Sequence, residues 1–216
     1  MLELDFVTRM PNFTLEAAAQ LPGSGVTALL GPSGCGKTTL AASIAGLRKE
    51  AAGLIRVGGR TFLSTAENIL LPAPERGIGF VFQNHRLFPH LSVLDNLRFG
   101  MTAGRRQPLA DERTLIDALG IGALLERRPD TLSGGESQRV ALGRAVLAAE
   151  TLLIMDEPLA SLDEARRLEL LDYFERIRDV TTIPVLYITH AREEAERLAD
   201  TVVELRAGKI LSVTHR

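Results

Sequence analysis

The sequence GPSGCGKT at residues 31–38 constrains the fold of this chain more than any other stretch. It follows the apolar run GVTALL (25–30) and precedes KTTLAASIAGL, in which apolar residues recur at helical spacing and Gly46 lies near the expected helix end. The pattern G-x-x-x-x-G-K-[ST] between a strand and a helix is typical of a phosphate-binding loop. The sequence therefore predicts an α/β domain built around a phosphate site.

The residues of this loop are the first candidates for nucleotide contact. Backbone N–H groups of a glycine-rich loop surround the β-phosphate, and the following helix directs its positive end toward it. Lys37 is placed to bridge the β- and γ-phosphates, and the Thr38 hydroxyl is placed to ligate Mg²⁺. The expected nucleotide-binding residues are Gly31, Pro32, Ser33, Gly34, Cys35, Gly36, Lys37, Thr38 and Thr39.

The stretch TLLIMDE (151–157) places acidic residues at the end of an apolar strand. Asp156 is a candidate to hold Mg²⁺ through water, as the second metal ligand that a phosphate loop requires. Glu157 is placed to accept a proton from a water that attacks the γ-phosphate. The apolar residues before this pair and Pro158 after it favour such chemistry over a solvated helix start.

Two further polar residues follow predicted strands. His190 ends PVLYITH, and ligands gather at the carboxyl ends of strands in open parallel sheets, so we expect it to contact the γ-phosphate. Gln83 leaves the strand-like run GIGFVF. Its amide is a candidate for contact with metal or water, and solvation in a loop is the alternative.

Hydrophobic patterns outline the rest of the fold. LELDFV and FTLEA flank a turn at 10–12 and predict an antiparallel pair. The last third alternates strand and helix, which predicts parallel strands with crossover helices. Further strands are predicted at GLIRVGG, GIGFVF, TLLIMD, PVLYITH and TVVELR, and further helices at DERTLIDALG, ESQRVALGRAVLAAE, DEARRLELLDYFERIRDV and AREEAERLAD.

Helical patterns dominate between about Leu87 and Ala149. We therefore expect a single α/β domain with a P-loop NTPase (RecA-like) core at 1–86 and 150–216, an antiparallel β subdomain, and an inserted α-helical subdomain at about 87–149. The length of 216 residues, the 45% hydrophobic content and the formal net charge of −2 fit one globular domain with a lobe. They do not indicate a general nucleic-acid or membrane-surface binder.

The location expected from the sequence is cytoplasmic. The single Cys35 rules out an internal disulfide and fits a reducing compartment. No apolar stretch reaches the roughly 18–20 residues of a membrane span, and the acidic start MLELDFVTRM is unlike a signal peptide. Because Cys35 lies near Lys37 and a helix N-terminus, we also expect its thiol to react with alkylating agents and bound ATP to protect it.

The stretch TLSGGESQRV (131–140) contains a second phosphate-binding element. Ser133, Gly134 and Gly135 lead into a helix predicted to begin near Glu136, and a helix N-terminus binds anions. This stretch belongs to the expected helical insertion, which carries it away from Lys37. A single chain therefore contains two separated phosphate-binding elements.

The chain resembles ATP-binding cassette (ABC) ATPases over almost its whole length. The motifs of that family occur here in the family's order: GPSGCGKT, Gln83, LSGGE (132–136), LLIMDE, SLD (161–163) and His190. The resemblance implies ATP and Mg²⁺ as ligands and a head-to-tail homodimer. It implies catalytic roles for Glu157, His190 and Gln83, and metal ligation by Thr38, Gln83 and Asp156.

The same resemblance explains the second phosphate-binding element. Each ATP would lie between residues 31–38 of one chain and residues 133–136 of its partner, so the family assigns Ser133, Gly134, Gly135 and Glu136 to the nucleotide. Asp163 would cross the interface and align the two sites. ATP would close the dimer, and hydrolysis would let it separate.

Within the family the chain is most similar to the ATPase subunits of importers, and among these to the molybdate type. The similarity rests on MLELDF, FVFQNHRLFPHLSVLDNLRFGM, LSGGESQRVALGRA and DEPLASLD, and on Glu136 in place of the more frequent glutamine. Sulfate-, iron- and polyamine-type subunits are almost as similar. The importer class implies membrane permease subunits as partners and, through them, a substrate-binding protein. It also implies a peripheral position on the cytoplasmic face of the inner (plasma) membrane, with no nucleic acid bound.

Other residues have two interpretations. The family stacks an aromatic ring on adenine, for which Phe13 and Phe6 are the candidates. The stretch RLFPHLS (86–92) is either a surface for a permease helix or ordinary packing of its apolar residues. Arg139 and Arg144 are expected on a solvated helix face.

Other nucleotide-binding classes fit the sequence less well. A GTPase would require an N-K-x-D guanine-binding motif, which the sequence lacks, and a P-loop kinase would leave LSGGE unexplained. A soluble ABC ATPase of DNA repair inserts a long coiled coil between the two phosphate loops, for which Lys37 and Ser133 lie too close. Translation types generally carry two cassettes in one chain. An importer ATPase is the prediction.

Overall fold

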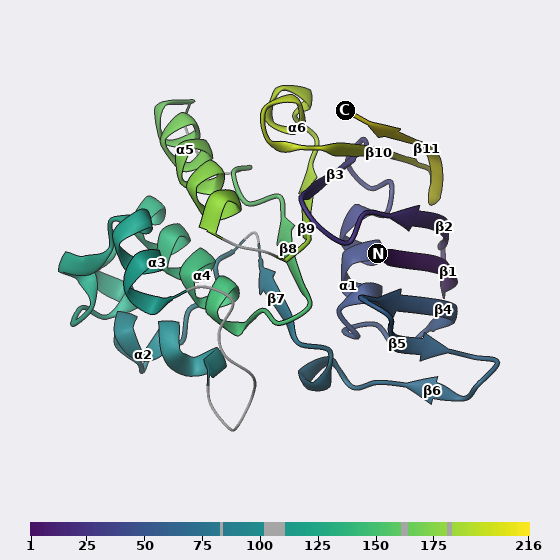
Figure 1. Cartoon of the computed structure of the whole chain (residues 1–216), viewed down its shortest axis with the longest axis horizontal. Coiled ribbons are helices and arrows are strands. Elements are labelled where there is room, and N and C mark those ends of the chain that lie inside the picture. The colour runs from purple at the N-terminus through teal and green to yellow at the C-terminus, as the bar shows by residue number, and fades with distance from the viewer. Residues whose placement is uncertain (83, 102–110, 161–163, 181–182) are drawn as a thin grey trace.

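The computed structural model of the chain describes residues 1–82, 84–101, 111–160, 164–180 and 183–216. These residues form one mixed sheet with helices packed on both faces (Figure 1). The strand order along the sheet is β6-β5-β4-β1-β2-β11-β10-β3-β9-β8-β7. The strands are β1 (Leu2–Met10), β2 (Phe13–Leu21), β3 (Val26–Leu30), β4 (Ala51–Val57), β5 (Arg60–Ser64), β6 (Ile69–Leu70), β7 (Ile78–Val81), β8 (Leu152–Asp156), β9 (Val185–Thr189), β10 (Thr201–Arg206) and β11 (Lys209–His215).

The strands that carry the predicted site are parallel. In this part of the sheet β10, β3, β9, β8 and β7 lie side by side and run in the same direction. Every residue of β3, β8 and β9 is buried, as expected for strands that helices cover on both faces. Because β8 and β9 are neighbours, Asp156 at the end of β8 and His190 just after β9 emerge at the same edge of the sheet.

The other part of the sheet is antiparallel. Strand β1 pairs with β2 and β4, and β5 and β6 continue the antiparallel pairing to the edge. Strand β11 pairs antiparallel with β10 and meets β2 at the Lys209–Glu16 pair, which joins the two parts into one sheet. The predicted turn at 10–12 lies between β1 and β2.

The sheet divides the core into two layers, and helices cover the parallel strands on each face. Leu152 and Ile154 of β8 pack in the layer that contains α1, whereas Leu153 and Met155 pack against the other helices. This alternation follows from the two-residue period of a strand. The helices are α1 (Lys37–Ile44), α2 (Val93–Arg98), α3 (Glu112–Leu119), α4 (Gly134–Ala148), α5 (Glu164–Val180) and α6 (Arg192–Leu198), with 3₁₀ turns at Ala73–Glu75, Phe99–Met101, Gly122–Leu124 and Pro129–Thr131.

The predicted fold class is confirmed: an α/β core carries an antiparallel β part and a group of helices inserted after β7. Between residues 87 and 149 the described residues form helices and turns and no strand, and the exact subdomain boundaries stay a prediction. The predicted strands and helices are present, but the sequence did not predict α2, β5, β6 and β11. Among the described helices, none is long and apolar enough to cross a membrane.

A buried arginine holds the far end of the helix that follows the phosphate loop. Arg76 is 1% exposed, and its guanidinium donates hydrogen bonds to the carbonyls of Ser43 and Ile44 at the end of α1, at 3.0 and 2.7 Å. Burial lowers the pKa of Arg76 to about 10, so the group is still charged at neutral pH. A side chain at Gly46, which has a φ of 75°, would lie 2.6 Å from Arg76 Nε, so glycine is required there. The cation neutralises the negative end of α1, whose positive end faces the phosphate loop.

Candidate nucleotide-binding site

The loop between β3 and α1 has the geometry of a phosphate cradle. Gly34 and Gly36 have φ angles of 78° and 108°, which lie in the left-handed region that favours glycine. A Cβ on Gly36 would lie 2.7 Å from Phe13 Cζ, so the loop backbone passes directly against that ring. Helix α1 begins at Lys37 with Gly36 as its N-cap residue, which directs the helix N-terminus into the loop.

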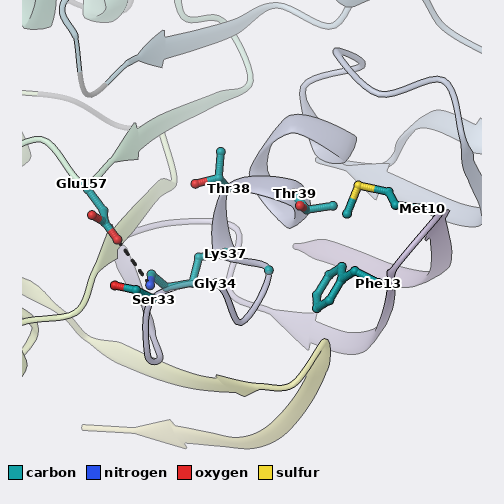
Figure 2. Close-up of a pocket in the computed structure, with 9 residues that line it drawn as sticks. Met10, Phe13, Ser33, Gly34, Lys37, Thr38, Thr39 and Glu157 are labelled. Carbon is teal, nitrogen blue, oxygen red and sulfur yellow. Dashed lines mark ion pairs between the residues drawn. The ribbon is translucent and has the colours of Figure 1, made fainter.

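Lys37 is buried in this loop with its ammonium group inside the cradle. Only 4% of the residue is exposed, and Nζ donates hydrogen bonds to the carbonyls of Gly31 and Pro32 at 2.9 and 3.2 Å. Nζ also lies 3.3 Å from Glu157 Oε1 (Figure 2). A buried cation requires such partners, and the loop concentrates positive charge where a phosphate would lie.

Thr38 and Asp156 meet across the site. Asp156, at the end of β8, is 7% exposed, and its Oδ1 accepts a hydrogen bond from Thr38 Oγ1 at 3.1 Å. Burial raises the pKa of Asp156, and the negative charge of Glu157 raises it further, while the Thr38 hydrogen bond and Lys37 act in the opposite direction. A hydroxyl and a carboxylate held this close form a set of oxygen donors that fits Mg²⁺.

Glu157 occupies a strained turn directly after β8. Its φ is 46°, a left-handed conformation that costs a non-glycine residue roughly 1–2 kcal/mol. Its amide donates to the Ile188 carbonyl of β9 at 3.0 Å, which fixes the turn to the sheet. His190 Nδ1 lies 3.7 Å from Glu157 Oε2, so the structure brings His190 beside the predicted base. Backbone strain of this kind is characteristic of functional sites.

Lys37, Thr38 and Glu157 line one pocket of about 450 Å³, whereas His190 lines a neighbouring cavity together with Gly31 and Pro32. Figure 2 shows Glu157 on one side of Lys37, with Phe13 and Met10 on the other side of the pocket. The lining residues are Met10, Phe13, Ser33, Gly34, Gly36, Lys37, Thr38, Thr39 and Glu157. Of the two aromatic candidates, Phe13 is in the pocket, whereas Phe6 is wrong because it is 2% exposed and packs in the core. Met10 was not predicted, since a methionine in a turn has no motif that would indicate a ligand contact.

The second phosphate-binding element lies at the start of α4. Ser133 is the N-cap residue, and a capping box joins its hydroxyl to the Glu136 amide at 3.3 Å and its amide to Glu136 Oε2 at 2.7 Å. These hydrogen bonds lower the pKa of Glu136. Glu136 therefore has a local structural role as the N3 residue of the box, a role that glutamine also fills, so the box does not explain why this chain has glutamate there.

This element lines a cavity of its own, of about 210 Å³. Its lining residues are Ser133, Gly135, Glu136, Arg139, Glu169 and Leu170, and it shares none with the pocket around Lys37. At Gly134 and Gly135 an added Cβ would meet no heavy atom within 4 Å, so the backbone of α4 is open to an approaching group there. The predicted separation of the two elements is therefore present in the structure.

Gln83 and Asp163 lie outside the described residues, so their predicted roles stay predictions. Cys35 is 4% exposed and belongs to the core layer of α1, which argues against the expected reactivity of its thiol, and the alkylation itself stays a prediction.

The expectation that Arg139 and Arg144 form a solvated helix face is wrong. Both are half-buried: Arg139 pairs with Glu169 at 3.1 Å, and Arg144 lies over the Phe88 ring at 5.0 Å. Burial lowers the pKa of Arg144.

The raised pKa of Asp156 leads to a prediction about stability. We expect Asp156→Asn to raise the melting temperature of the nucleotide-free protein at neutral pH, because the amide keeps an acceptor for Thr38 and removes a buried charge. The same change should weaken nucleotide binding that depends on Mg²⁺.

The pH dependence of that effect has a definite sign. Because the folded state binds the Asp156 proton more tightly than the unfolded state, wild-type stability is gained as pH falls through the raised pKa. The difference in melting temperature from Asp156→Asn should therefore narrow at acidic pH. Thermal unfolding followed by circular dichroism checks this, and a variant less stable than wild type at neutral pH would contradict it.

Comparison with known proteins agrees with this geometry. A family model described as ABC transporter matches residues 16–160. The molybdenum import ATP-binding protein ModC of Mesorhizobium japonicum is 51% identical over 212 residues, which cover 98% of this chain and 57% of that protein. ModC of Yersinia pestis bv. Antiqua (strain Antiqua) is 47% identical, with coverage of 99% and 58%. The chain thus spans a little over half the length of these curated relatives.

A solved structure has the same fold. The dimeric structure of MJ0796, a bacterial ABC transporter cassette, superposes with a TM-score of 0.76 at 23% identity and covers 100% of this chain and 98% of that one. The family model covers more than half of the present sequence, including the loop around Lys37, the helix start at Ser133 and the strand that ends at Asp156. The chain belongs to the ABC transporter family.

Proposed function

We propose that this chain binds and hydrolyses ATP and thereby energises an ABC importer. The observation that carries the proposal is the buried Lys37 ammonium, held inside its loop and 3.3 Å from Glu157, with the Thr38–Asp156 pair beside it. A loop of this kind binds the β- and γ-phosphates, while the Phe13 ring and Met10 provide an apolar surface for the adenine.

Mg²⁺ fits the same residues. Thr38 Oγ1 and the Asp156 carboxylate would hold it, with Gln83 as a further candidate outside the described residues. A bound Mg²⁺ neutralises charge that develops on the transferred phosphoryl group. Because burial raises the pKa of Asp156, a nearby cation also favours its charged form.

The chain supplies a base for the attacking water. The Glu157 carboxylate lies between Lys37 and His190: Oε1 is 3.3 Å from Lys37 Nζ, and Oε2 is 3.7 Å from His190 Nδ1. When the γ-phosphate engages Lys37, the Glu157 carboxylate is released to orient a water and accept its proton. His190, which follows the neighbouring strand β9 and lies 3.7 Å from Glu157, is proposed to hold the γ-phosphate. Glu157 and His190 are therefore the proposed catalytic residues, together with Gln83.

The functional unit that we propose is a head-to-tail homodimer. The phosphate cradle at 31–38 and the α4 N-terminus at 133–136 line separate cavities, which supports a nucleotide held between the cradle of one chain and the α4 N-terminus of another. The open backbone at Gly134 and Gly135 suits a γ-phosphate presented by the partner. Asp163 is proposed to cross the interface.

The proposed cargo is molybdate, supported by the names of relatives that are about half identical to this chain. The partners are then membrane permease subunits and, indirectly, a substrate-binding protein, with the chain peripheral on the cytoplasmic face of the inner membrane. Arg86, Pro89 and His90 are exposed beside the Phe88–Phe99 ring pair and form the proposed permease surface. Permease and binding-protein genes beside the gene for this chain would decide the cargo, and sulfate, iron or polyamine genes there would contradict molybdate.

Removal of the base tests hydrolysis and dimerisation together. We expect Glu157→Gln to bind ATP and to hydrolyse it at a rate lowered by about 100-fold or more, because a general base contributes at least that much. The trapped ATP should then hold two chains together, visible as a dimer by size-exclusion chromatography with multi-angle light scattering. The double variant Lys37→Ala with Glu157→Gln is the control and should stay monomeric. A Glu157→Gln chain that stays monomeric with ATP bound contradicts the shared site.

Mixing two inactive variants tests whether the site is shared. Lys37→Ala damages the cradle, and Gly135→Asp places a carboxylate at the start of α4, so either homodimer has two damaged sites. A mixed dimer has one intact site and one site with both defects. Provided one intact site turns over alone, ATPase activity should return in the mixture and be absent from each variant by itself. A site contained in one chain predicts no recovery at any mixing ratio.

A further inference from the structure

Gln138 connects the α4 helix to two other parts of the molecule. The residue is 0% exposed and lies one turn beyond the Ser133 cap. Its Nε2 donates a hydrogen bond to the carbonyl of Pro158, the residue after Glu157. Its Oε1 lies 2.5 Å from His85 Nε2, in the segment that follows β7. One buried amide therefore bridges the turn that holds the proposed base and the segment that begins after Gln83.

The chemistry of these groups fixes how the bridge is oriented. A backbone carbonyl only accepts hydrogen bonds, so the Gln138 NH₂ group must face Pro158 and its oxygen must face His85. His85 must then carry its proton on Nε2. Each member of the chain His85–Gln138–Pro158 has one arrangement that satisfies its neighbour. A displacement at either end leaves a polar atom of the buried Gln138 side chain without a partner, which is unfavourable.

The residue 84–91 segment is attached to α4 at a second point. Arg144, two turns beyond Gln138, donates from Nη2 to the His85 carbonyl at 3.1 Å, and its guanidinium lies 5.0 Å from the Phe88 ring centroid. Asn96 is 0% exposed; its Oδ1 accepts from the Phe88 amide at 2.8 Å and its Nδ2 donates to the Phe88 carbonyl at 3.1 Å. The segment is therefore joined to α4 through Gln138 and Arg144 and to α2 through Asn96, by hydrogen bonds that are all part-buried.

Backbone strain is concentrated at the two ends of this bridge. In the described part of the chain five non-glycine residues have positive φ, and three of them are Glu157, His85 and Arg86, at 46°, 54° and 48°. Residues in such conformations persist only where their surroundings hold them in place. Gln138 supplies a contact that holds both strained turns, through Pro158 at one end and through His85 at the other.

We propose that Gln138 is a positioning residue for the hydrolytic reaction and that His85 acts through it. The inference rests on the proposed ATPase function and adds a structural link from the 84–91 segment, through Gln138, to the turn that holds Glu157. The side chain of Gln138 fixes the position of the Pro158 carbonyl and thereby the direction of the Glu157 carboxylate. Because Gln138 also binds His85, the position of Gln138 depends on where the 84–91 segment lies. A partner that displaces this segment would change the rate of hydrolysis without a contact to ATP.

Four single variants and one double variant test the proposal kinetically. Gln138→Met keeps the length of the side chain and removes both hydrogen bonds, whereas His85→Phe keeps the Gln138–Pro158 bond and removes the link to the segment. His85→Gln keeps an N–H donor of similar reach. The control is Thr151→Val, which removes part-buried hydrogen bonds to the Arg76 and Gly77 carbonyls at the opposite end of β8. All are assayed at a temperature where thermal unfolding shows each to be folded.

We expect kcat to fall on the order of 10- to 100-fold in Gln138→Met, as a small misplacement of a reacting group can cause, with the Kd for ATP unchanged. His85→Phe should lower kcat by less, and the double variant with Gln138→Met should fall no further than Gln138→Met alone. His85→Gln should restore most of the loss, and Thr151→Val should leave kcat unchanged. An unchanged kcat in Gln138→Met, a parallel loss in ATP affinity, or additive effects in the double variant would overturn the proposal.

Hydrogen exchange of the nucleotide-free chain tests the same bridge without reference to catalysis. The amides of Glu157 and Ala160 donate to the Ile188 and Glu157 carbonyls at 3.0 and 3.3 Å and report on the turn. His85→Phe should speed their exchange although His85 does not contact them, and Thr151→Val should not. If the wild-type chain hydrolysed no ATP, the proposed function would be contradicted. The hydrogen-exchange rates would still show whether Gln138 couples His85 to the Glu157 turn. Faster exchange confined to residues 84–91 would overturn the bridge alone.

Discussion

The contact between the Lys37 ammonium and the Glu157 carboxylate is the interaction on which the rest of the site depends. A lysine buried to this degree is stable only with partners, because a charge removed from water must be paired or hydrogen-bonded. The partners here are two carbonyls of its own loop and the residue that follows β8. The loop at residues 31–38 and the turn at Glu157 are thereby held together, although they lie far apart in the sequence.

The fold is arranged so that this contact forms and persists. Strands β3, β9 and β8 are buried on both faces and end at one edge, which brings the loop, His190 and Glu157 together. Behind the loop, the charge of Arg76 caps the last carbonyls of α1. Ser43 Oγ bonds to both the Thr39 carbonyl and the Thr8 hydroxyl, at 2.9 and 3.0 Å. Helix α1 is therefore fixed at the end away from the phosphate, and its positive end stays aimed at the cradle.

The sequence predicts the parts of this protein in which local chemistry and tertiary packing demand the same residues. The loop around Lys37 and the strand ending at Asp156 are such parts, because the phosphate site needs those residue types at fixed spacing. The elements that were not predicted are short or exposed. Helix α2 has six residues and a Ser92 cap, and β11 is exposed along most of its length and forms through pairing with β10.

Side-chain contacts between elements far apart in the sequence were the least predictable from sequence. Arg144 reads as a surface residue, yet it binds a segment some sixty positions earlier. In the sequence Gln138 is one polar residue among several that follow LSGGE (132–136). The hydrogen bonds of its buried side chain depend on His85 and Pro158, which belong to two other segments. Cys35 was expected to be reactive because it lies in a phosphate loop, and it is buried because the loop turns its side chain into the core of α1. Neither partner nor burial has a sequence pattern of its own.

The most direct test of the central claim is calorimetric titration of the wild-type chain with ATP, ADP and AMP in the presence of Mg²⁺. If the buried Lys37 cation and the cradle at residues 31–38 recognise the β- and γ-phosphates as proposed, ATP and ADP should bind and AMP should bind at least about 100-fold more weakly, equivalent to the loss of one or more charge-assisted contacts. Similar affinities for AMP and ATP would contradict the account, because they would mean that the nucleoside and not the phosphate cradle holds the ligand.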